Sequence, residues 1–215
     1  MEQGVRHIHM TPIKTILFDF GGVLGSGAHD WSGTLLPVVD AADLSVGEME
    51  GLWYRRWPSL AVGASDLSAL WSDVSQASPR HTDPSVLADV FYSAITANED
   101  AFRLARDLKT QGLRLAIVSN ESRGGMDVKI RKFSLADIFE KVYCSAVMGF
   151  AKPDPMFFSY ILHDLALEPH EVVLLDNEAK NIAAAEELGI RAFLFRNAAQ
   201  SRIALEQVLG RSLYR

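Results

Sequence analysis

Residues 16–24 read ILFDFGGVL, and this stretch decides the fold. An apolar run leads directly into the acid Asp19, and two glycines follow at Gly21 and Gly22. A short, mostly apolar run that ends at glycines is typical of a strand buried on both faces. A carboxylate at the end of such a strand costs free energy unless it has a partner or a task. The stretch therefore predicts a buried strand over Ile13–Phe20 with a functional acid near its end.

The rest of the chain carries more segments of the same kind, separated by helical patterns. Strands are expected over 113–119, 141–145, 171–176 and 190–195. Helices are expected over 99–111, 181–188 and 202–209, the last with Ser201 as its N-cap. Strands that alternate with helices form a parallel sheet covered by helices on both faces. The sequence therefore predicts an α/β fold.

The stretch from about residue 25 to residue 98 has a different pattern, because it contains no buried strand run. Its apolar residues favour helices over 46–57, 64–75 and 84–96, and it holds all four tryptophans of the chain. It falls between the first strand and the rest of the sheet, so we expect a helical insert that covers the strand ends. The tryptophans fit the core of a small domain, and a role in stacking on a substrate stays open for any one of them.

Composition excludes several classes of protein. The chain has 215 residues and a formal net charge of −6, which gives no general attraction to nucleic acid or to acidic membranes. Cys144 is the only cysteine, so no intrachain disulfide can form, and a reducing, cytoplasmic location is expected. No apolar run is long enough for a membrane span. Residues 1–9 are polar and read as an extension or tag, and the chain could be a monomer or a homodimer.

Polar residues gather where the predicted strands end, at Asp19, Ser119–Asn120 and Asp176–Asn177. The carboxyl ends of parallel strands meet at one edge of a sheet, and ligands bind outside that edge. Asp19 suits a nucleophile, because the glycines after it let backbone N–H groups approach an anion. Ser119 and Asn120 offer a hydroxyl and an amide to phosphate oxygens. Lys152, in the proline-bounded loop GFAKPDP, is placed to neutralise an anion.

These segments together resemble the haloacid dehalogenase-like superfamily of hydrolases. The resemblance runs through FDFGGVL, AIVSN, GFAKPDP and VLLDNEAKNIAAAEELGI, and it covers nearly the whole chain. It is closest to subfamily IA, with a C1-type helical cap and a first motif of the form DxGG, a phosphatase-like subgroup. It implies a three-layer Rossmannoid core over 10–24 and 98–215, with the cap at 25–97.

The resemblance also implies a Mg²⁺-dependent phosphatase that acts on a small phosphorylated metabolite through an aspartyl-phosphate on Asp19. The catalytic residues would be Asp19, Ser119, Lys152 and Asp176. Phosphate would be bound by Gly21, Gly22, Ser119, Asn120 and Lys152. Mg²⁺ would be held by Asp19, the Gly21 carbonyl, Asp176 and Asn177, with the choice between the last two left open.

The chain departs from the family pattern at Gly21, where related phosphatases carry an acid that protonates the leaving group. His29, Asp30 or a residue of the insert could replace that acid, or the substrate could have a good leaving group. Two alternatives follow: a 2-haloacid dehalogenase, which needs neither the acid nor Mg²⁺, and a weakly catalytic or regulatory binding protein. Candidate substrate contacts in the insert are Arg55, Arg56, Trp57 and His81.

Overall fold

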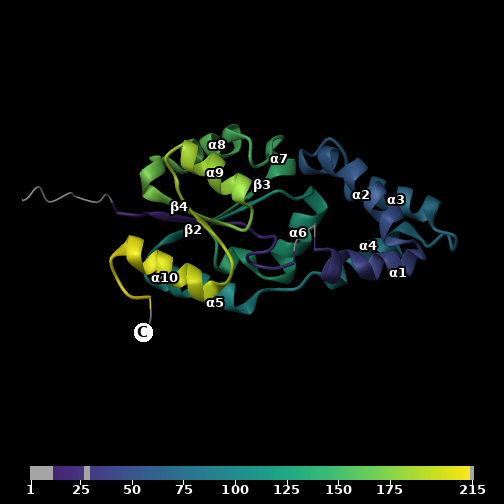
Figure 1. Ribbon diagram of the computed structural model, residues 1–215, viewed down its shortest axis with the longest axis horizontal. Helices are drawn as coiled ribbons and strands as arrows, with labels where there is room; N and C mark the ends of the chain where they lie inside the picture. Colours follow the sequence, from purple (N-terminus) through teal and green to yellow (C-terminus); the bar gives the residue numbers. More distant parts are fainter. Residues whose placement is uncertain (1–11, 27–29, 214–215) are drawn as a thin grey trace, which may run out of the picture.

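The computed structural model describes residues 12–26 and 30–213. Within them a parallel sheet of five strands runs in the order β3-β2-β1-β4-β5 (Figure 1). The bounds are β1 (Thr15–Phe18), β2 (Arg114–Ser119), β3 (Lys141–Cys144), β4 (Val172–Asp176) and β5 (Arg191–Leu194). The predicted α/β fold is confirmed, and each strand is shorter than predicted at one or both ends. The predicted extension at residues 1–9 lies outside the described part of the chain.

Helices cover both faces of this sheet, so the core has three layers (Figure 1). One face packs against α5 (Glu99–Thr110), α6 (Arg123–Lys132) and α10 (Ala198–Leu209). The other face packs against α8 (Pro155–Leu165) and α9 (Ala179–Glu187). Three short helical segments complete the core: η2 (Leu135–Asp137), α7 (Ser145–Met148) and η3 (Pro169–Glu171).

The central strand β1 shows why the sheet needs both layers. Ile16 and Phe18 belong to one hydrophobic cluster, and Leu17 between them belongs to the other. All three side chains are fully buried. Successive side chains of a strand point to opposite faces, so an unbroken apolar run requires an apolar partner on each side. The chain emerging from β1 is thus fixed on both faces just before Asp19.

The insert between β1 and α5 forms a second group of helices at the right of Figure 1. It contains η1 (Trp31–Leu35), α1 (Leu36–Ala42), α2 (Val46–Ala61), α3 (Leu67–Ala77) and α4 (Pro84–Ala94). The sequence pattern missed the first two, because a glycine and a proline interrupt it there. The buried rings of Trp53 and Trp71 both pack against Phe91, as expected for a small aromatic core.

The two chain crossings between the insert and the sheet lie side by side. Ser26 N–H donates to the Thr96 carbonyl over 2.9 Å, and Asn98 N–H donates to the Leu24 carbonyl over 2.8 Å. Gly25 lies between these bonds, and a β-carbon there would come within 2.4 Å of the Thr96 carbonyl oxygen. Glycine is therefore required for the close approach of the two crossings.

Two predicted helix bounds were wrong for physical reasons. Helix α10 begins at Ala198 instead of Arg202, because the Asn197 side chain caps it by accepting a 2.9 Å hydrogen bond from Gln200 N–H. Helix α2 continues through Pro58 to Ala61, because burial of the residues after Pro58 offsets the missing hydrogen bond. No helix of the described residues is long and apolar enough to cross a membrane.

Candidate active site

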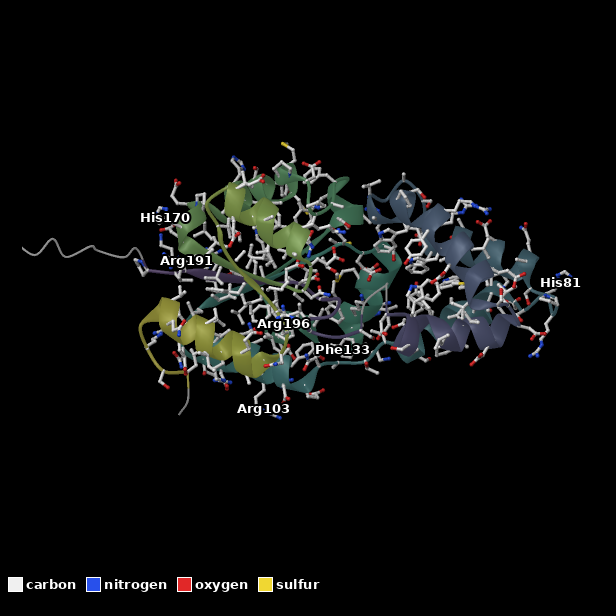
Figure 2. The ribbon with its side chains drawn as sticks, viewed as in Figure 1. His81, Arg103, Phe133, His170, Arg191 and Arg196 are labelled. Atoms are coloured by element: carbon white, nitrogen blue, oxygen red, sulfur yellow. The ribbon has the colours of Figure 1, made fainter. Side chains whose placement is uncertain are left out.

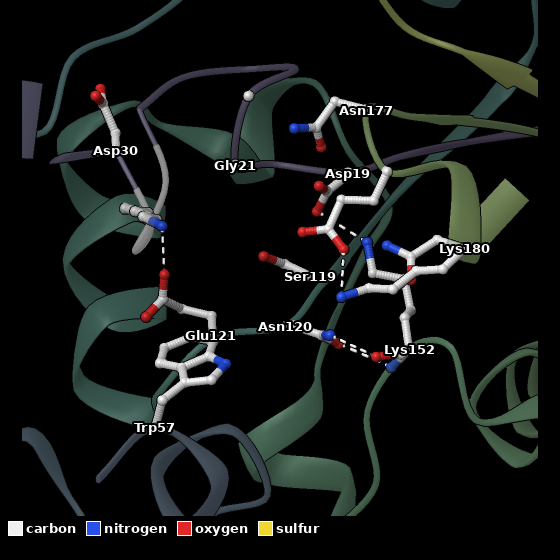
Figure 3. Close-up of a pocket in the computed structure, with 14 residues that line it drawn as sticks. Asp19, Gly21, Asp30, Trp57, Ser119, Asn120, Glu121, Lys152, Asn177 and Lys180 are labelled. Carbon is white, nitrogen blue, oxygen red and sulfur yellow. Dashed lines mark hydrogen bonds and ion pairs between the residues drawn. The ribbon is translucent and has the colours of Figure 1, made fainter. Parts of the chain in front are cut away.

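Asp19 lies directly after β1 and shares a buried lysine with Asp176, the last residue of β4. Lys152 Nζ lies 3.0 Å from Asp19 Oδ1 and 2.6 Å from Asp176 Oδ2. The Phe20 N–H also donates to Asp19 Oδ1, over 2.7 Å. Figure 3 shows Asp19 and Lys152 on the same side of the pocket. The two acids predicted at the sheet edge and the loop residue Lys152 therefore form one contiguous unit.

Asp176 serves as the anchor of this unit. Its side chain is fully buried, and its oxygens accept hydrogen bonds from Asn181 Nδ2 at 3.0 and 3.1 Å and from Glu178 N–H at 2.8 Å. With Lys152 added, both carboxylate oxygens are engaged by donors of the protein. In this arrangement Asp176 positions Lys152, and the choice between Asp176 and Asn177 as a ligand of Mg²⁺ stays a prediction.

The buried setting changes the pKa of both partners. Burial raises the pKa of Asp19 to about 6; Lys152 opposes that rise and Asp176 adds to it. Burial on its own would lower the pKa of Lys152, but the two carboxylates outweigh it and raise the pKa above its usual value. Lys152 therefore stays a cation, while Asp19 takes up a proton at mildly acidic pH.

The side chain of Asn120 is hydrogen-bonded to the backbone of Lys152. Its side-chain amide donates to the Lys152 carbonyl oxygen over 2.7 Å and accepts from the Lys152 N–H over 2.9 Å. These bonds hold the backbone of Lys152 to the end of β2. The amide nitrogen keeps a second N–H and Asn120 lines the pocket, so its role in binding phosphate stays a prediction. The neighbouring hydroxyl of Ser119 points into the pocket and is available to a ligand (Figure 3).

Oxygen atoms meet on the other side of Asp19. One polar atom of the Asn177 amide lies 3.0 Å from the Gly21 carbonyl oxygen and 3.2 Å from Asp19 Oδ2. With the nitrogen turned inward, the amide donates a hydrogen bond to each. With the oxygen turned inward, the amide oxygen lies beside the Gly21 carbonyl oxygen and Asp19 Oδ2. Gly22 makes the approach possible: its φ is +76°, and a β-carbon there would lie 2.4 Å from Asn177 Nδ2.

This oxygen set fits a magnesium ion. Adjacent ligands of an octahedron with bonds of about 2.1 Å lie about 3.0 Å apart, close to the spacing seen here. Mg²⁺ takes few protein ligands and keeps several waters, so one carboxylate, one carbonyl and one amide suffice. No group of three His, Cys, Asp or Glu side chains suited to a metal occurs in the part of the chain that the structure describes.

The site opens into a pocket of about 280 Å³, small for a ligand site. Its wall includes Trp57 from α2 of the insert and Asp30 (Figure 3). The sequence analysis missed four other polar residues that line it: Glu121, Lys129, Lys180 and Asn181. Asn181 alone carried a signal, because it follows the strand-end acid Asp176 by little more than one helical turn.

The other candidates from the insert lie elsewhere. Arg56 pairs with Asp73, its Nε 2.5 Å from Oδ2. Arg55 is exposed and does not line the pocket. His81 lies at the far end of the insert, at the right of Figure 2, with its side chain in solvent. His29 lies outside the described residues.

Comparison with known proteins assigns the family. A sequence model described as haloacid dehalogenase-like hydrolase matches residues 87–195, just over half of the chain. The chain therefore belongs to the haloacid dehalogenase-like hydrolase family, as the motifs predicted.

Two curated relatives each match about half of the chain. Drimenol cyclase drtB of Aspergillus calidoustus is 30% identical over 132 residues, which is 57% of this chain and 25% of that protein. Sesquiterpene phosphatase astK of Aspergillus oryzae is 24% identical over 107 residues, which is 50% of this chain and 55% of that protein. The matched segment thus spans between about a quarter and about half of these relatives.

Solved structures show the same fold at low identity. A haloacid dehalogenase family enzyme of Bacteroides thetaiotaomicron, an Asp-to-Ala mutant in complex with magnesium and inorganic phosphate, has a TM-score of 0.74 at 20% identity. The match covers 88% of this chain and 98% of that one. A 2-haloacid dehalogenase of Pseudomonas syringae has a TM-score of 0.66 at 21% identity, covering 92% and 98%. The fold alone therefore does not choose between the two chemistries.

Proposed function

We propose that this chain is a Mg²⁺-dependent phosphatase that acts on a small phosphorylated metabolite through an aspartyl-phosphate on Asp19. One observation carries the proposal. The Asp19 carboxylate lies between a buried lysine on one side and the oxygens of Gly21 and Asn177 on the other, facing a pocket with room for a small ester. The sesquiterpene phosphatase among the relatives supports this reaction class.

Each residue of the site has its own role in the reaction. An Asp19 oxygen forms a bond to phosphorus while the bond from phosphorus to the leaving oxygen breaks. The Ser119 hydroxyl and Lys152 hold the phosphoryl oxygens, and Lys152 offsets the repulsion between two anions. Water then attacks the phosphorus of the acyl phosphate, which releases inorganic phosphate and restores the carboxylate. Asp176 and Asn120 keep Lys152 in place throughout.

Asp19 Oδ2, the Gly21 carbonyl and the Asn177 amide oxygen would hold the magnesium ion. The cation supplies charge that neutralises the phosphate and lets it approach a carboxylate. Binding requires the Asn177 amide to present its oxygen, whereas the metal-free chain gains two hydrogen bonds with the nitrogen inward. The metal bound by related folds supports this assignment.

The absence of a side chain at Gly21 restricts the leaving group. The chain has no acid at that position to protonate a departing oxygen. General acid catalysis contributes about 10²–10⁴-fold, so esters with poor leaving groups should react slowly. Acyl phosphates and anomeric sugar phosphates leave without this help, and we infer that they are the better substrates.

We further infer that residues 25–97 act as a C1-type cap of subfamily IA and that the core comprises 10–24 and 98–215. The insert begins directly after the DxGG motif, and its Trp57 reaches the pocket. The substrate class thus depends on the insert as well as the core. A cytoplasmic location fits the single cysteine, Cys144, which is buried.

The alternatives predict different chemistry. A dehalogenase displaces halide from carbon and has no use for a cation beside Asp19, whereas the oxygen set at Gly21 and Asn177 fits one. A binding protein would use neither the nucleophile nor the metal.

The test is hydrolysis of acetyl phosphate, p-nitrophenyl phosphate and glucose 1-phosphate, with Mg²⁺ and with EDTA. Activity that EDTA abolishes supports the phosphatase; halide release from 2-haloacids in EDTA, or no turnover, overturns it.

Asn177→Asp should lower the Mg²⁺ concentration that gives half-maximal activity by about tenfold, because an added charged oxygen strengthens a cation site. The measurement is a Mg²⁺ titration of initial rates. Asn197→Asp, which also changes an amide to an acid but at the N-cap of α10, serves as the matched control. An unchanged Mg²⁺ requirement in the Asn177 variant would place the metal elsewhere.

The rate should fall below about pH 6, tenfold per pH unit, because the Asp19 pKa is raised to about 6 and the protonated acid cannot attack phosphorus. A higher Mg²⁺ concentration should move this limb to lower pH, since the cation and the proton compete for one carboxylate. Phosphate esters also titrate near pH 6. The pH–rate profile is therefore measured at two Mg²⁺ concentrations. The substrate pKa is common to both profiles, so the difference between them reports the titration of Asp19. If the acidic limb of the pH–rate profile does not move with the Mg²⁺ concentration, the assignment of this pKa to Asp19 is contradicted.

A further inference from the structure

A buried ion pair in the pocket wall takes no part in the chemistry above. Glu121 follows the end of β2, and Lys129 lies on α6. Their side chains are only 3% and 2% exposed, and the Glu121 Oε2 and Lys129 Nζ atoms are hydrogen-bonded. Both line the same pocket as Asp19. Burial of two charges is costly, so a pair that lies in a ligand pocket calls for a role there.

The pair retains hydrogen-bonding capacity for a ligand. Glu121 Oε1 accepts from Ser122 N–H at 2.9 Å and from Ser122 Oγ at 3.1 Å, which fixes the carboxylate. Lys129 Nζ lies 4.5 Å from the centre of the Phe20 ring, so the ring faces another side of the ammonium. An ammonium has three N–H donors. Among the described residues, the third N–H of Lys129 has no hydrogen-bond partner. Buried donors normally have a partner.

The pair lies where a leaving group would extend. In Figure 3, Glu121 lies with Trp57 and Asp30 on the wall away from Asp19, Asn177 and Lys152. A phosphoryl group at Asp19 would therefore direct its ester oxygen and the attached group toward Glu121.

The aromatic ring on this wall offers an apolar surface. Trp57 stacks on Trp53 with ring centres 5.5 Å apart, so one face of Trp57 is covered by the core of the insert. Trp57 also lines the pocket. An indole in this position can pack against the C–H groups of a ring.

We propose that Glu121, Lys129 and Trp57 form the leaving-group subsite and select a neutral, hydroxyl-bearing group over an anionic one. This rests on the proposed phosphatase function. A hydroxyl can accept a hydrogen bond from Lys129 and donate one to Glu121, a match for a pair whose charges balance. An anionic leaving group would face the carboxylates of Glu121 and Asp30 with only the Lys129 ammonium beside them, because the other lysine of the pocket, Lys180, pairs with Glu178.

Two matched substrates test the charge balance: glucose 1-phosphate and glucuronic acid 1-phosphate, which differ by one carboxylate. The readout is the ratio of their kcat/KM values, and the wild type should favour glucose 1-phosphate. Glu121→Gln should lower this ratio about tenfold or more, because Lys129 is then free to pair with the carboxylate of the substrate. Lys129→Met should raise the ratio, because an uncompensated Glu121 repels that carboxylate.

Opposite shifts in the two variants are the signature of a subsite. A purely structural pair would lower both rates by the same factor and leave the ratio unchanged, and that result would overturn the inference. Breaking a buried pair is destabilising, and a single variant that leaves one charge unpaired could fail to fold. The double variant Glu121→Gln with Lys129→Met removes both charges together. The ratio of kcat/KM values can therefore still be measured in it. Glu140→Gln, in an exposed pair with Arg114, is the matched surface control.

A binding experiment separates this inference from the proposed function. Calorimetry with the Asp19→Asn protein measures the affinity of each sugar phosphate without turnover. If the wild type hydrolyses no phosphate ester, the phosphatase proposal fails. The subsite still stands if glucose 1-phosphate binds more tightly than glucuronic acid 1-phosphate and Glu121→Gln reverses that order. Equal affinities in all variants would overturn the subsite whatever the turnover.

Discussion

Asp19→Asn should abolish the hydrolysis of every phosphate ester, a loss of about 10⁴-fold or more in kcat, in line with the removal of a catalytic nucleophile. The amide keeps the shape of the side chain but has no anionic oxygen to attack phosphorus. Substrate binding should survive, because Ser119 and Lys152 are retained. Loss of kcat with a nearly unchanged substrate affinity is therefore the expected pattern.

The measurement is single-turnover hydrolysis of acetyl phosphate at saturating Mg²⁺, with mass spectrometry of the wild type to detect a phosphoryl group on Asp19. Asp43→Asn makes the same chemical change in an exposed pair with Arg80 and serves as the control. A substantial rate in the Asp19 variant would mean that water attacks the substrate directly. The covalent route would then be wrong even if the enzyme is a phosphatase.

Lys152→Met should have the largest effect on stability. Lys152 is buried between Asp19 and Asp176, so its removal leaves two carboxylates facing each other without a cation. Breaking a buried ion pair costs about 3–5 kcal/mol of the free energy of unfolding. The pKa of Asp19 should rise further in the folded state, since it loses the counter-charge that lowers it. The folded protein then binds more protons than the unfolded chain, so the variant should become more stable as the pH falls from 7 to 5.

Urea unfolding of the variant at both pH values measures this effect. The double variant Lys152→Met with Asp176→Asn should recover part of the lost stability, because it removes one of the two opposed charges. Lys14→Met breaks the ion pair with Glu171, in which the lysine is half exposed, and should have a much smaller effect. Equal losses in the Lys14 and Lys152 variants would mean that the buried pairing contributes little to the fold.

The sequence was sufficient to predict the sheet, because its strands are buried on both faces and so appear as apolar runs. Parallel strands also bring their carboxyl ends together, which is why Asp19, Ser119 and Asp176 could be predicted at one edge. Their roles could not be predicted. The ion pair of Asp176 with Lys152 and its hydrogen bond from Asn181 depend on side-chain directions in space, which the sequence does not show.

The wall of the pocket was the least predictable part. Glu121 and Lys129 belong to different segments, and only the way α6 packs beside β2 brings them together. Trp53 and Trp57 are one helical turn apart on α2, yet one is buried and the other reaches the pocket. Helical spacing shows that two such residues share a face of a helix, but it does not show what that face meets.

The position of β1 at the middle of the sheet governs when the site can form during protein synthesis. Thr15 pairs with Arg114 on one side and with Val172 on the other. The nucleophile is therefore synthesised before either neighbour, and its strand gains the second one only after the insert, β2 and β3 have left the ribosome. Until then β1 exposes an unpaired, apolar edge, which is a known hazard for aggregation. A nascent chain arrested before β4 should accordingly depend on chaperones that bind extended apolar segments.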